Sequence, residues 1–426
     1  FISCGSRQIN KKSKLVFSSW HPILSKENID TSIKQHFEIR RDEEGSENQF
    51  LAILTCTGTV YWNNEKLTEG QQRILQDGDL ISIKSIRKQL KFIDMRQEVA
   101  QIAGLNLFLG RFLGKGGSGE VRVGFDVRTL QKFAVKTVNW NEDVIFESDF
   151  SQARSFALGE VELMRLVSHQ NVLRLLNFIE TPDKLNLVLE LMEFDLFDAV
   201  EKNPQRKFSE VEAKFAAYQV AQGLQHIHKK AIAHMDLKVS TENLHEIPTF
   251  TLKFQPNNIF VTHLDGEVCY KIGDFGLSKI DVNLTQKMST LICASPELID
   301  PDVEIFSGRL HDCWSFGVLI YFLLSGRLPF DPDDDFIRVY ISYGQYYPIL
   351  DVSVSAVNFI NSLLVVDPNC RLRSDQILSH AWFDDEEAFA ARVSKFYGEI
   401  SGTKSNEKQE KFEVARRRSV RLMSMR

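Results

Sequence analysis

Cysteine is scarce in this sequence, and no two cysteines stand close together. The six cysteines form no C-x-x-C pair, so a zinc site or a disulfide framework is not expected and a reducing compartment is favoured. Long hydrophobic runs are also absent. The longest, Gly317 to Leu324, has eight residues, whereas a membrane-spanning helix needs about 20. The chain is therefore not predicted to insert into a membrane.

An excess of charge of one sign is missing as well. The 51 basic and 57 acidic residues give a net charge of −6, so the composition indicates no direct nucleic-acid binding. Hydrophobic residues at 43% and charged residues at 25% are typical of a globular protein and exclude a wholly disordered chain or a collagen. The 426 residues exceed one average domain and predict two or three. Since the chain begins with Phe1 rather than Met, we expect a fragment or an incomplete gene model.

The first hundred residues have the pattern of a β-sandwich. Short runs of β-branched and aromatic residues alternate with turn formers such as Asn63-Asn64 and Asp77-Gly78-Asp79. Strands at this spacing predict two packed sheets. The predicted strands are Phe37–Arg40, Phe50–Thr55, Thr59–Trp62, Leu80–Ile83 and Leu90–Asp94.

Beyond residue 105 the pattern changes to a mixture of strands and helices. Strand-like Lys132–Val138 is followed by helical periodicity, and Ser209-x-x-Glu212 is a capping box that predicts the start of a helix. The last part of the chain is polar. From Thr403 to Arg426 it has eight Lys or Arg and three Glu, a net charge of +5. Arg416-Arg417-Arg418 is either a nuclear-import patch or a solvated charged segment.

A glycine-rich segment begins a set of residues suited to phosphate chemistry. Gly114, Gly116 and Gly119 lie between two predicted strands, where phosphate could approach a backbone that no Cβ covers. A simple glycine-rich hairpin explains this segment equally well. Lys136 then lies within an apolar strand, where its charge is costly unless it is paired. A nucleotide phosphate and Glu160, on a predicted helix, would pair it.

Further motifs follow in a fixed order, which makes chance a poor explanation. They are His234-Met235-Asp236-Leu237-Lys238, Asp274-Phe275-Gly276, Ser295-Pro296-Glu297, Asp312-Cys313-Trp314-Ser315-Phe316-Gly317 and Asp367-Pro368-Asn369-Cys370-Arg371. With the glycine-rich segment, they resemble the catalytic domain of eukaryotic protein kinases over residues 107–385. Lys238, two residues after Asp236, resembles the serine/threonine class. The resemblance implies ATP bound between a small β-rich lobe and a larger helical lobe, and hence an α+β chain with an all-β sandwich before the two-lobed kinase fold.

The resemblance also implies roles in phosphoryl transfer, in which positive charge and positioning stabilise the transferred group. Lys136 would hold the ATP phosphates and would itself be held by Glu160. Asp236 would accept the proton of the substrate hydroxyl, and Lys238 would contact the γ-phosphoryl group. The Mg²⁺ ligands would be Asn258 and Asp274, and Glu297 with Arg371 would form a buried ion pair. ATP would be bound by Gly114, Gly116, Gly119, Val121, Ala134, Lys136, Glu190, Met192 and Phe260.

The chain departs from the kinase pattern directly after Lys238. Removing the seventeen residues from Val239 to Gln255 gives H-M-D-L-K-P-N-N, which places Asn258 five positions after Asp236. The insert begins Val-Ser and ends in Gln, which the splice-donor sequence GTAAGT and the acceptor end CAG can encode. We interpret residues 239–255 as a translated, unspliced intron. An insert present in the protein would either loop out harmlessly or separate the base from the metal ligand and abolish activity.

Two further departures concern the activation of the kinase. Met235 replaces the arginine that normally pairs with a phosphate on the activation segment, so strict dependence on that phosphorylation is not expected. Between Cys293 and Ser295 the segment lacks the G-T-P-x-Y stretch that shapes the pocket beside the accepted hydroxyl, through either a real deletion or a second gene-model error. The candidate phosphorylation sites are Thr285, Ser289 and Thr290.

Residues 1–97 resemble a forkhead-associated (FHA) domain, a β-sandwich that binds phosphothreonine. The matching landmarks are Gly5-Ser6-Arg7, His36, Gly58-Thr59, Asn63-Asn64 and Asp77-Gly78-Asp79. The resemblance implies a phosphopeptide site formed by Arg7, Ser32, His36 and Asn63. The serine of the family's S-x-x-H motif is displaced, since Ile33 stands at its position and Ser32 is one residue away. A degenerate module that only packs is the alternative.

These features divide the chain into a sandwich (1–97), a linker (98–106), a catalytic domain (107–385) and a partly disordered, basic tail (386–426). An FHA sandwich before a serine/threonine kinase resembles the checkpoint kinases of DNA-damage and meiotic signalling. The predicted activity is ATP- and Mg²⁺-dependent phosphorylation of protein Ser and Thr residues, in the nucleus and cytoplasm. The FHA-like domain would recruit a phosphothreonine-containing adaptor or an upstream kinase. The alternative function is that of a pseudokinase or phosphothreonine-binding scaffold.

Overall fold

The computed structural model describes a large part of the 426-residue chain in two compact units. The described residues are 3–4, 14–17, 36–42, 51–75, 79–86, 88–94, 107–116, 119–126, 131–140, 147–238, 258–264, 266–281, 284–285, 291–332, 334–384 and 387–402. Among the described residues, the first unit comprises those from 3 to 193 with 273–278, and the second comprises 194–238, 258–272 and those from 279 to 402.

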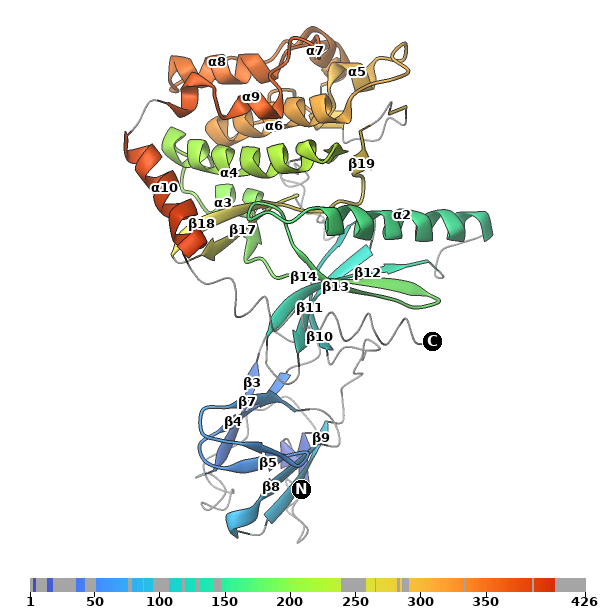
Figure 1. The fold of residues 1–426 in the computed structure, drawn as a ribbon, viewed down its shortest axis with the longest axis vertical. Coiled ribbons are helices and arrows are strands. Elements are labelled where there is room, and N and C mark those ends of the chain that lie inside the picture. Colours follow the sequence, from blue (N-terminus) through green and yellow to red (C-terminus); the bar gives the residue numbers. More distant parts are fainter. Residues whose placement is uncertain are drawn as a thin grey trace. The chain divides into compact units, whose positions relative to one another are not determined.

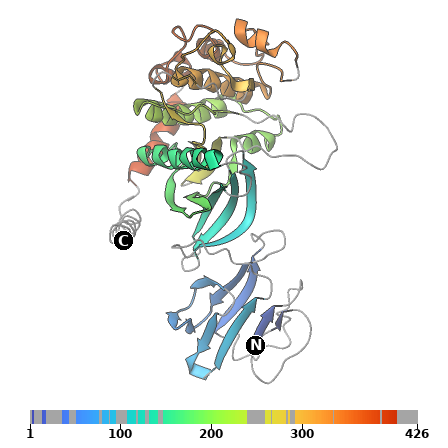
Figure 2. The same cartoon turned by 90° about the vertical axis from the view of Figure 1, so that its right-hand side faces the viewer.

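The amino-terminal part of the first unit forms the predicted sandwich of two sheets (Figure 1 and Figure 2). One sheet has the order β1-β2-β9-β8-β5-β6 and the other has the order β3-β4-β7. Its strands are β1 (Ser3–Cys4), β2 (Lys14–Phe17), β3 (Phe37–Asp42), β4 (Leu51–Cys56), β5 (Val60–Trp62), β6 (Glu65–Leu67), β7 (Gln72–Ile74), β8 (Leu80–Ile83) and β9 (Lys88–Asp94), with a 3-10 turn at Lys84–Ile86. Apolar side chains with no exposed surface form its core, namely Leu54, Val60, Leu67, Ile74, Ile81 and Ile83.

All five strands predicted in this region are present. The sequence pattern does not predict β1, β2, β6 and β7, because two to four residues carry too little alternation to be recognised. The β5–β6 turn follows its sequence signal closely. Asn63 and Asn64 have φ values of 45° and 70°, the left-handed conformations that asparagine tolerates in a tight hairpin turn.

The small kinase-like sheet of the first unit is antiparallel, with the order β10-β11-β12-β14-β13. Its strands are β10 (Leu107–Gly116), β11 (Gly119–Asp126), β12 (Lys132–Asn139), β13 (Leu175–Glu180) and β14 (Lys184–Glu190). A cluster of Leu107, Phe133, Val135 and Val188 forms part of its core. The helix α2 (Glu147–Leu166) lies beside β13 and supplies Glu160.

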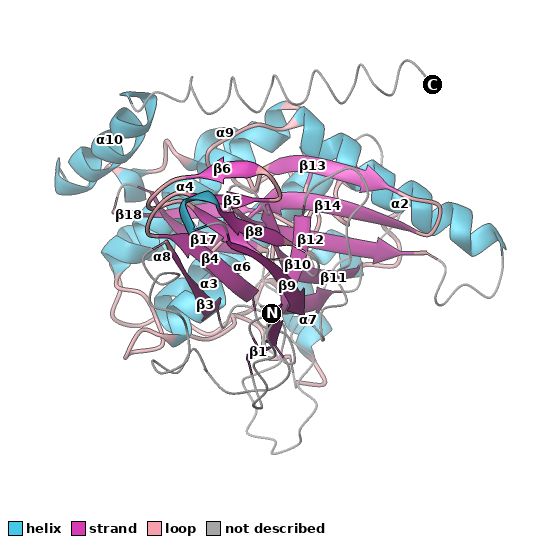
Figure 3. Ribbon diagram, turned by 90° about the horizontal axis from the view of Figure 1, so that it is seen from below, coloured by secondary structure: helices cyan, strands magenta, loops and turns pink. Residues whose placement is uncertain are grey.

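The second unit is mainly helical, and its helices are coloured cyan in Figure 3. They are α3 (Leu196–Glu201), α4 (Glu210–Lys229), α5 (Pro296–Ile299), α6 (Gly308–Ser325), α7 (Ile337–Tyr343), α8 (Val354–Leu363), α9 (Ser374–Ile377) and α10 (Glu387–Gly402), with 3-10 turns at Leu291–Cys293 and Ala381–Phe383. Its strands are β15 (Phe194–Asp195), β16 (Ile232–Ala233), β17 (Ile259–Leu264), β18 (Glu267–Ile272) and β19 (Lys279–Ile280). The strands pair as β15-β17-β18 and β16-β19.

Two helices organise this unit. The helix α4 begins at the predicted capping box, in which the Ser209 N–H donates to Glu212 and the Glu212 N–H donates back to the Ser209 hydroxyl. The helix α6 is buried along every residue from His311 to Leu324, and so forms the centre of the helical core. Within the described part of the chain, no helix is both long and apolar enough to cross a bilayer.

The carboxy-terminal segment differs from the expected polar tail over its first residues. Residues 387–402 form α10, which packs on α4 through aromatic contacts. Phe396 meets Phe215 edge to face with 5.6 Å between ring centroids, and Phe389 meets Tyr218 at 5.8 Å. The buried phenylalanines favour a packed helix here, because each removes a large apolar surface from water. The remainder of the predicted tail, from residue 403, and the predicted linker 98–106 lie outside the described residues.

Candidate active site

The Lys136 ammonium is held by two carboxylates in the first unit. Its Nζ lies 2.9 and 3.0 Å from the two Glu160 oxygens and 2.8 Å from Asp274 Oδ1. Lys136 projects from β12, where it pairs with Val121 on one side and Leu187 on the other. Both Lys136 and Glu160 are buried. The structure thus supplies the charge partner that a lysine in an apolar strand requires.

Charge within this triad keeps the lysine protonated. Burial alone would lower the pKa of Lys136, but the nearby Glu160 and Asp274 carboxylates raise it above its ordinary value. Burial raises the pKa of Glu160, and Lys136 opposes that effect. One cation facing two carboxylates leaves a site that can accept further positive charge.

The glycine-rich hairpin lies against β12 at a place where only glycine fits. Gly119 has φ of +149°, and a Cβ on it would come within 2.3 Å of the Thr137 carbonyl oxygen. Gly114 pairs with Val121 across the hairpin, and a Cβ there would meet nothing within 4 Å. Gly119 is therefore explained by packing, whereas the fold leaves space beside Gly114. Gly116 pairs with Gly119, and residues 117–118 lie outside the described residues.

The other predicted ATP-binding residues divide between the two units. Val121 and Ala134 are half-buried in the small sheet, and Glu190 ends β14 two residues before Met192. The backbone at Glu190 is fixed, since Glu190 N donates to Arg174 O at 3.1 Å and the Glu190 carboxylate accepts from Arg174 N at 2.8 Å. Phe260 is half-buried on β17 of the second unit.

Asp236, Lys238 and Asn258 meet in the second unit. The Asn258 amide donates to the Asp236 backbone carbonyl at 2.6 Å and to Asp236 Oδ2 at 2.7 Å. Lys238 Nζ lies 3.1 Å from the same carboxylate oxygen. Asn258 is fully buried, and its Oδ1 has no hydrogen-bond partner among the described residues. An orphaned amide oxygen beside a carboxylate suits a hard divalent cation, which prefers oxygen ligands.

Asp274 has the backbone conformation of a residue at a functional turn. Its φ of 59° lies in the left-handed region, which aspartate tolerates better than most residues. Its Oδ1 accepts from Lys136 and also from Gly276 N at 3.4 Å. Asp274 and the residues beside it belong to the first unit, whereas Asn258 belongs to the second.

Asp312 of α6 holds the backbone of the catalytic loop, residues 234–238. Its carboxylate accepts from the backbone N–H of His234 at 2.7 Å and of Met235 at 2.8 Å, and it lies 2.9 Å from His228 Nε2. Burial alone would raise the pKa of Asp312, but these hydrogen-bonding and charge contacts from His228 and its neighbours hold it below its ordinary value. The motif that contains Asp312 is recognised in the sequence, but the sequence does not predict which backbone groups Asp312 binds.

Gln219 is a second positioning residue without a sequence signal of its role. It is fully buried on α4 and clamps β18, because its Nε2 donates to Val268 O and its Oε1 accepts from Tyr270 N, both at 3.0 Å. A glutamine between apolar neighbours on one helix face is the only hint that the sequence offers. The clamp holds the β17–β18 hairpin that begins directly after Asn258.

Met235 occupies an apolar pocket where the family has an arginine. It is 1% exposed, and its Sδ would lie 2.7 Å from a Cβ placed on Gly308. Leu284 Cδ1 lies 2.8 Å from the same point. Met235 therefore packs beside Leu284 of the activation segment through apolar surface. Thr285 is exposed, and Ser289 and Thr290 lie outside the described residues.

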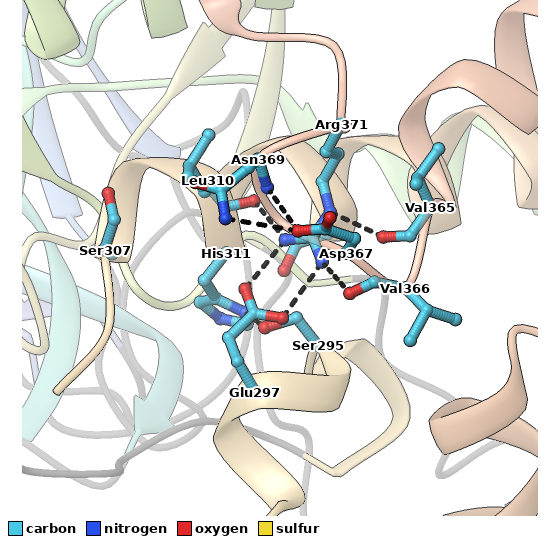
Figure 4. A network of polar contacts seen from close by, with 12 residues as sticks. Ser295, Glu297, Ser307, Leu310, His311, Val365, Val366, Asp367, Asn369 and Arg371 are labelled. Atoms are coloured by element: carbon cyan, nitrogen blue, oxygen red, sulfur yellow. Dashed lines mark hydrogen bonds and ion pairs between the residues drawn. The ribbon is translucent and has the colours of Figure 1, made fainter. Parts of the chain in front are cut away.

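The Glu297–Arg371 pair is buried at the end of the activation segment, as Figure 4 shows. Arg371 Nη1 and Nη2 donate to the two Glu297 oxygens at 2.7 and 2.9 Å. Three backbone carbonyls accept the other guanidinium hydrogens, at Leu310, Val365 and Val366. Burial alone would raise the pKa of Glu297, but hydrogen bonds and charge from Arg371 hold it below its ordinary value.

Two of the four predicted phosphopeptide residues are described. The His36 carbonyl accepts from Thr57 N at 2.9 Å and Gly58 N at 3.0 Å, and its Nε2 lies 3.4 Å from Ser85 Oγ. The Asn63 amide donates to Asp79 at 2.6 Å and accepts from Leu80 N at 2.8 Å. The Asn63 side chain thus links the β5–β6 turn to the start of β8, and its contact with a peptide stays a prediction. Arg7 and Ser32 lie outside the described residues, as does the insert 239–255.

Comparison with known families agrees with this geometry. The protein kinase domain model matches residues 108–383, and the FHA domain model matches residues 18–84. The chain belongs to the protein kinase family. Within that family it carries an amino-terminal FHA domain and is a serine/threonine protein kinase.

The relatives include other serine/threonine kinases. The chain is 32% identical over 387 residues to "Ovarian-specific serine/threonine-protein kinase Lok" of Drosophila melanogaster, covering 86% of this chain and 76% of Lok. It is 30% identical over 383 residues to "Probable serine/threonine-protein kinase fhkC" of Dictyostelium discoideum, covering 85% of this chain and 60% of fhkC. Both alignments are longer than the kinase match of residues 108–383, so they extend into the region before it.

Proposed function

We propose that this kinase is of the checkpoint type and that its FHA domain recruits it to phosphothreonine-bearing proteins. The observation that best supports catalytic activity is the contact between Asn258 and Asp236. These residues are adjacent in space although residues 239–255 stand between them in the sequence. The insert therefore does not part the proposed base from the proposed metal ligand, and nothing found supports the pseudokinase alternative.

The residues of the site fit ATP with a divalent cation. Mg²⁺, when bound, would neutralise charge on the ATP phosphates, and the orphaned Asn258 Oδ1 and the Asp274 carboxylate would hold it. Lys136, fixed by Glu160, would donate to the phosphates. The hairpin with Gly114, Gly116 and Gly119 would cover them, and Val121, Ala134 and Phe260 would contact the adenine.

Asp236 is the proposed group that orients the substrate. Its Oδ2 accepts from Asn258 and lies 3.1 Å from Lys238, which fixes the carboxylate in one orientation. A Ser or Thr hydroxyl would donate to this carboxylate and lose its proton to it during transfer. Lys238 would balance the charge that develops on the γ-phosphoryl group.

A phosphoryl-transfer assay tests the activity. With radiolabelled ATP, Mg²⁺ and a serine-containing basic peptide, Asp236→Asn is expected to lower the rate about 10³-fold, because the proton acceptor is lost. The amide keeps the shape of the carboxylate, so the thermal midpoint should stay unchanged. Equal rates for the parent and Asp236→Asn would refute the proposed site.

Recruitment is tested by calorimetry on the full chain. A phosphothreonine peptide is expected to bind, and the same peptide without phosphate is not. The gain from recruitment is a higher local concentration of partner, which does not require a tighter catalytic site. If neither peptide binds, the FHA domain only packs and the recruitment part of the proposal fails, while the kinase activity is unaffected.

The proposed location is the nucleus as well as the cytoplasm. The support is the basic tail, in particular Arg416-Arg417-Arg418. Replacing these three residues with alanine in a fluorescent fusion is expected to reduce nuclear signal. An unchanged distribution would contradict the import role of the patch.

A further inference from the structure

Side chains of α6 hold two separate segments of the second unit. Asp312 holds the backbone of the catalytic loop at His234 and Met235. His311 and Ser315 lie four residues apart and hence on one helix face. This second face contacts the end of the activation segment, because Ser315 Oγ donates to the Cys293 carbonyl at 2.9 Å.

His311 makes the more unusual of these contacts. It has no exposed surface, and its Nδ1 lies 3.1 Å from the hydroxyl of Ser295, which is also fully buried. Either group can be the donor of this bond, because a hydroxyl both donates and accepts, and Nδ1 donates in one neutral tautomer of histidine and accepts in the other. The Ser295 side chain also helps to keep the pKa of the Glu297 carboxyl below its ordinary value, after the larger effects of burial and Arg371. Figure 4 shows His311, Ser295 and Glu297 together beside Arg371.

The ring of His311 is suited to this role. Burial lowers its pKa below the ordinary value, against the opposing charges of Asp312, Glu297 and Asp236. The ring therefore stays neutral at neutral pH.

We propose that His311 is a positioning residue of the kinase, which holds the end of the activation segment in register with the catalytic loop through its hydrogen bond to Ser295. The adjacent Asp312 fixes the catalytic loop, so neighbouring side chains of one rigid helix set the distance between the two segments. An apolar pair could fill the same space, but only a hydrogen bond fixes the direction of the segment. The bond matters here because the segment lacks the G-T-P-x-Y stretch.

The test compares kinetics of full-chain variants with a basic serine peptide. Ser295→Ala and His311→Val each remove the bond, and each is expected to lower kcat/KM for the peptide about 10-fold, since small misplacements of a reacting group have effects of this order or larger. The KM for ATP should stay within about two-fold, because the geometry around Lys136 involves neither residue. His311→Asn, whose amide can donate or accept near the Nδ1 position, should retain most of the activity.

The double variant separates positioning from general damage. Ser295→Ala with His311→Val should be no slower than Ser295→Ala alone, because Ser295→Ala already removes the bond that His311→Val removes. His380→Val is the matched control. The His380 Nδ1 accepts from Trp382 N at 3.1 Å at the start of a 3-10 turn, away from the segment. It should leave kcat/KM unchanged even if it lowers the thermal midpoint.

Hydrogen exchange gives a second readout that does not require activity. Amides of residues 291–299 should exchange at least about 10-fold faster in Ser295→Ala and His311→Val than in the parent or in His380→Val, because the local hold is lost. The proposal is overturned if peptide kcat/KM stays within two-fold of the parent, if the two losses multiply in the double variant, or if exchange in this segment is unchanged. Equal transfer rates for the parent and Asp236→Asn would instead refute the catalytic assignment.

Discussion

Replacing Arg371 with methionine should destabilise the helical unit strongly. The substitution removes the bidentate contact with Glu297, at 2.7 and 2.9 Å, and the donors for three backbone carbonyls. The Arg371 side chain is 0% exposed and that of Glu297 is 6% exposed. Breaking a buried pair by removing one partner costs 3–5 kcal/mol, so we expect about 4 kcal/mol. At roughly 2–4 °C per kcal/mol, the thermal midpoint should fall by about 12 °C.

The stability lost in Arg371→Met depends on pH, and the ion pair determines the direction of that dependence. The folded-state pKa of Glu297 lies below its ordinary value of 4.5, so the stability from its ionisation is complete above that pH and is lost as pH falls. Without Arg371, burial would raise the pKa of Glu297, and the carboxyl would protonate at a higher pH. The difference between the parent and Arg371→Met should therefore be largest near neutral pH and should shrink on acidification.

Thermal unfolding followed by tryptophan fluorescence measures this difference. The guanidinium lies 5.1 Å from the ring centroid of the fully buried Trp314, which reports on the same place. Adding Glu297→Gln to Arg371→Met should recover part of the loss, since the uncompensated charge is then gone. A loss below about 1 kcal/mol, the value of an exposed pair, would refute the reasoning. So would a difference that grows as pH falls.

Two further substitutions test other parts of the fold. Gly119→Ala should cost at least about 2 kcal/mol in thermal unfolding, because φ is +149° and the new Cβ would lie 2.3 Å from the Thr137 carbonyl oxygen. Gly114→Ala is its control and should stay within about 0.5 kcal/mol, and equal losses would contradict the packing argument. Phe396→Ala should cost about 3–5 kcal/mol in denaturant unfolding, because the ring is 2% exposed between α10 and α4. A negligible loss would mean that α10 does not belong to the folded unit.

Local patterns account for most of what the sequence predicts correctly. Alternation of apolar residues gives the sandwich strands, and the Ser209-x-x-Glu212 box gives the first turn of α4. A lysine in an apolar strand demands a partner, and the structure places Lys136 against Glu160, 24 residues away. These inferences succeed because each depends on a short segment or on one strong electrostatic requirement.

Contacts between distant segments are what the sequence does not predict. Gln219 and His311 are polar residues in apolar stretches, and nothing nearby in the chain identifies Val268 or Ser295 as their partners. The sequence predicts a polar tail where α10 lies, because charged residues separate its few phenylalanines. In the structure the phenylalanines are buried, and some of the charged residues form ion pairs with the rest of the unit. Arg392 is one example, since it lies 3.1 Å from Glu267 at the tip of the β17–β18 hairpin.

The insert shows why spacing in the chain and spacing in the fold can differ. Asp236 and Asn258 are 22 residues apart, and without residues 239–255 they would be five apart. Loop closure grows as (3/2)RT ln n, so lengthening this connection costs only about 1.3 kcal/mol. Each residue has its own anchor. Asp312 fixes the loop before Asp236, whereas the pairing of β17 with β18, which Gln219 clamps, fixes Asn258. The two residues can meet because their anchors lie in one folded unit, whatever the length of chain between them.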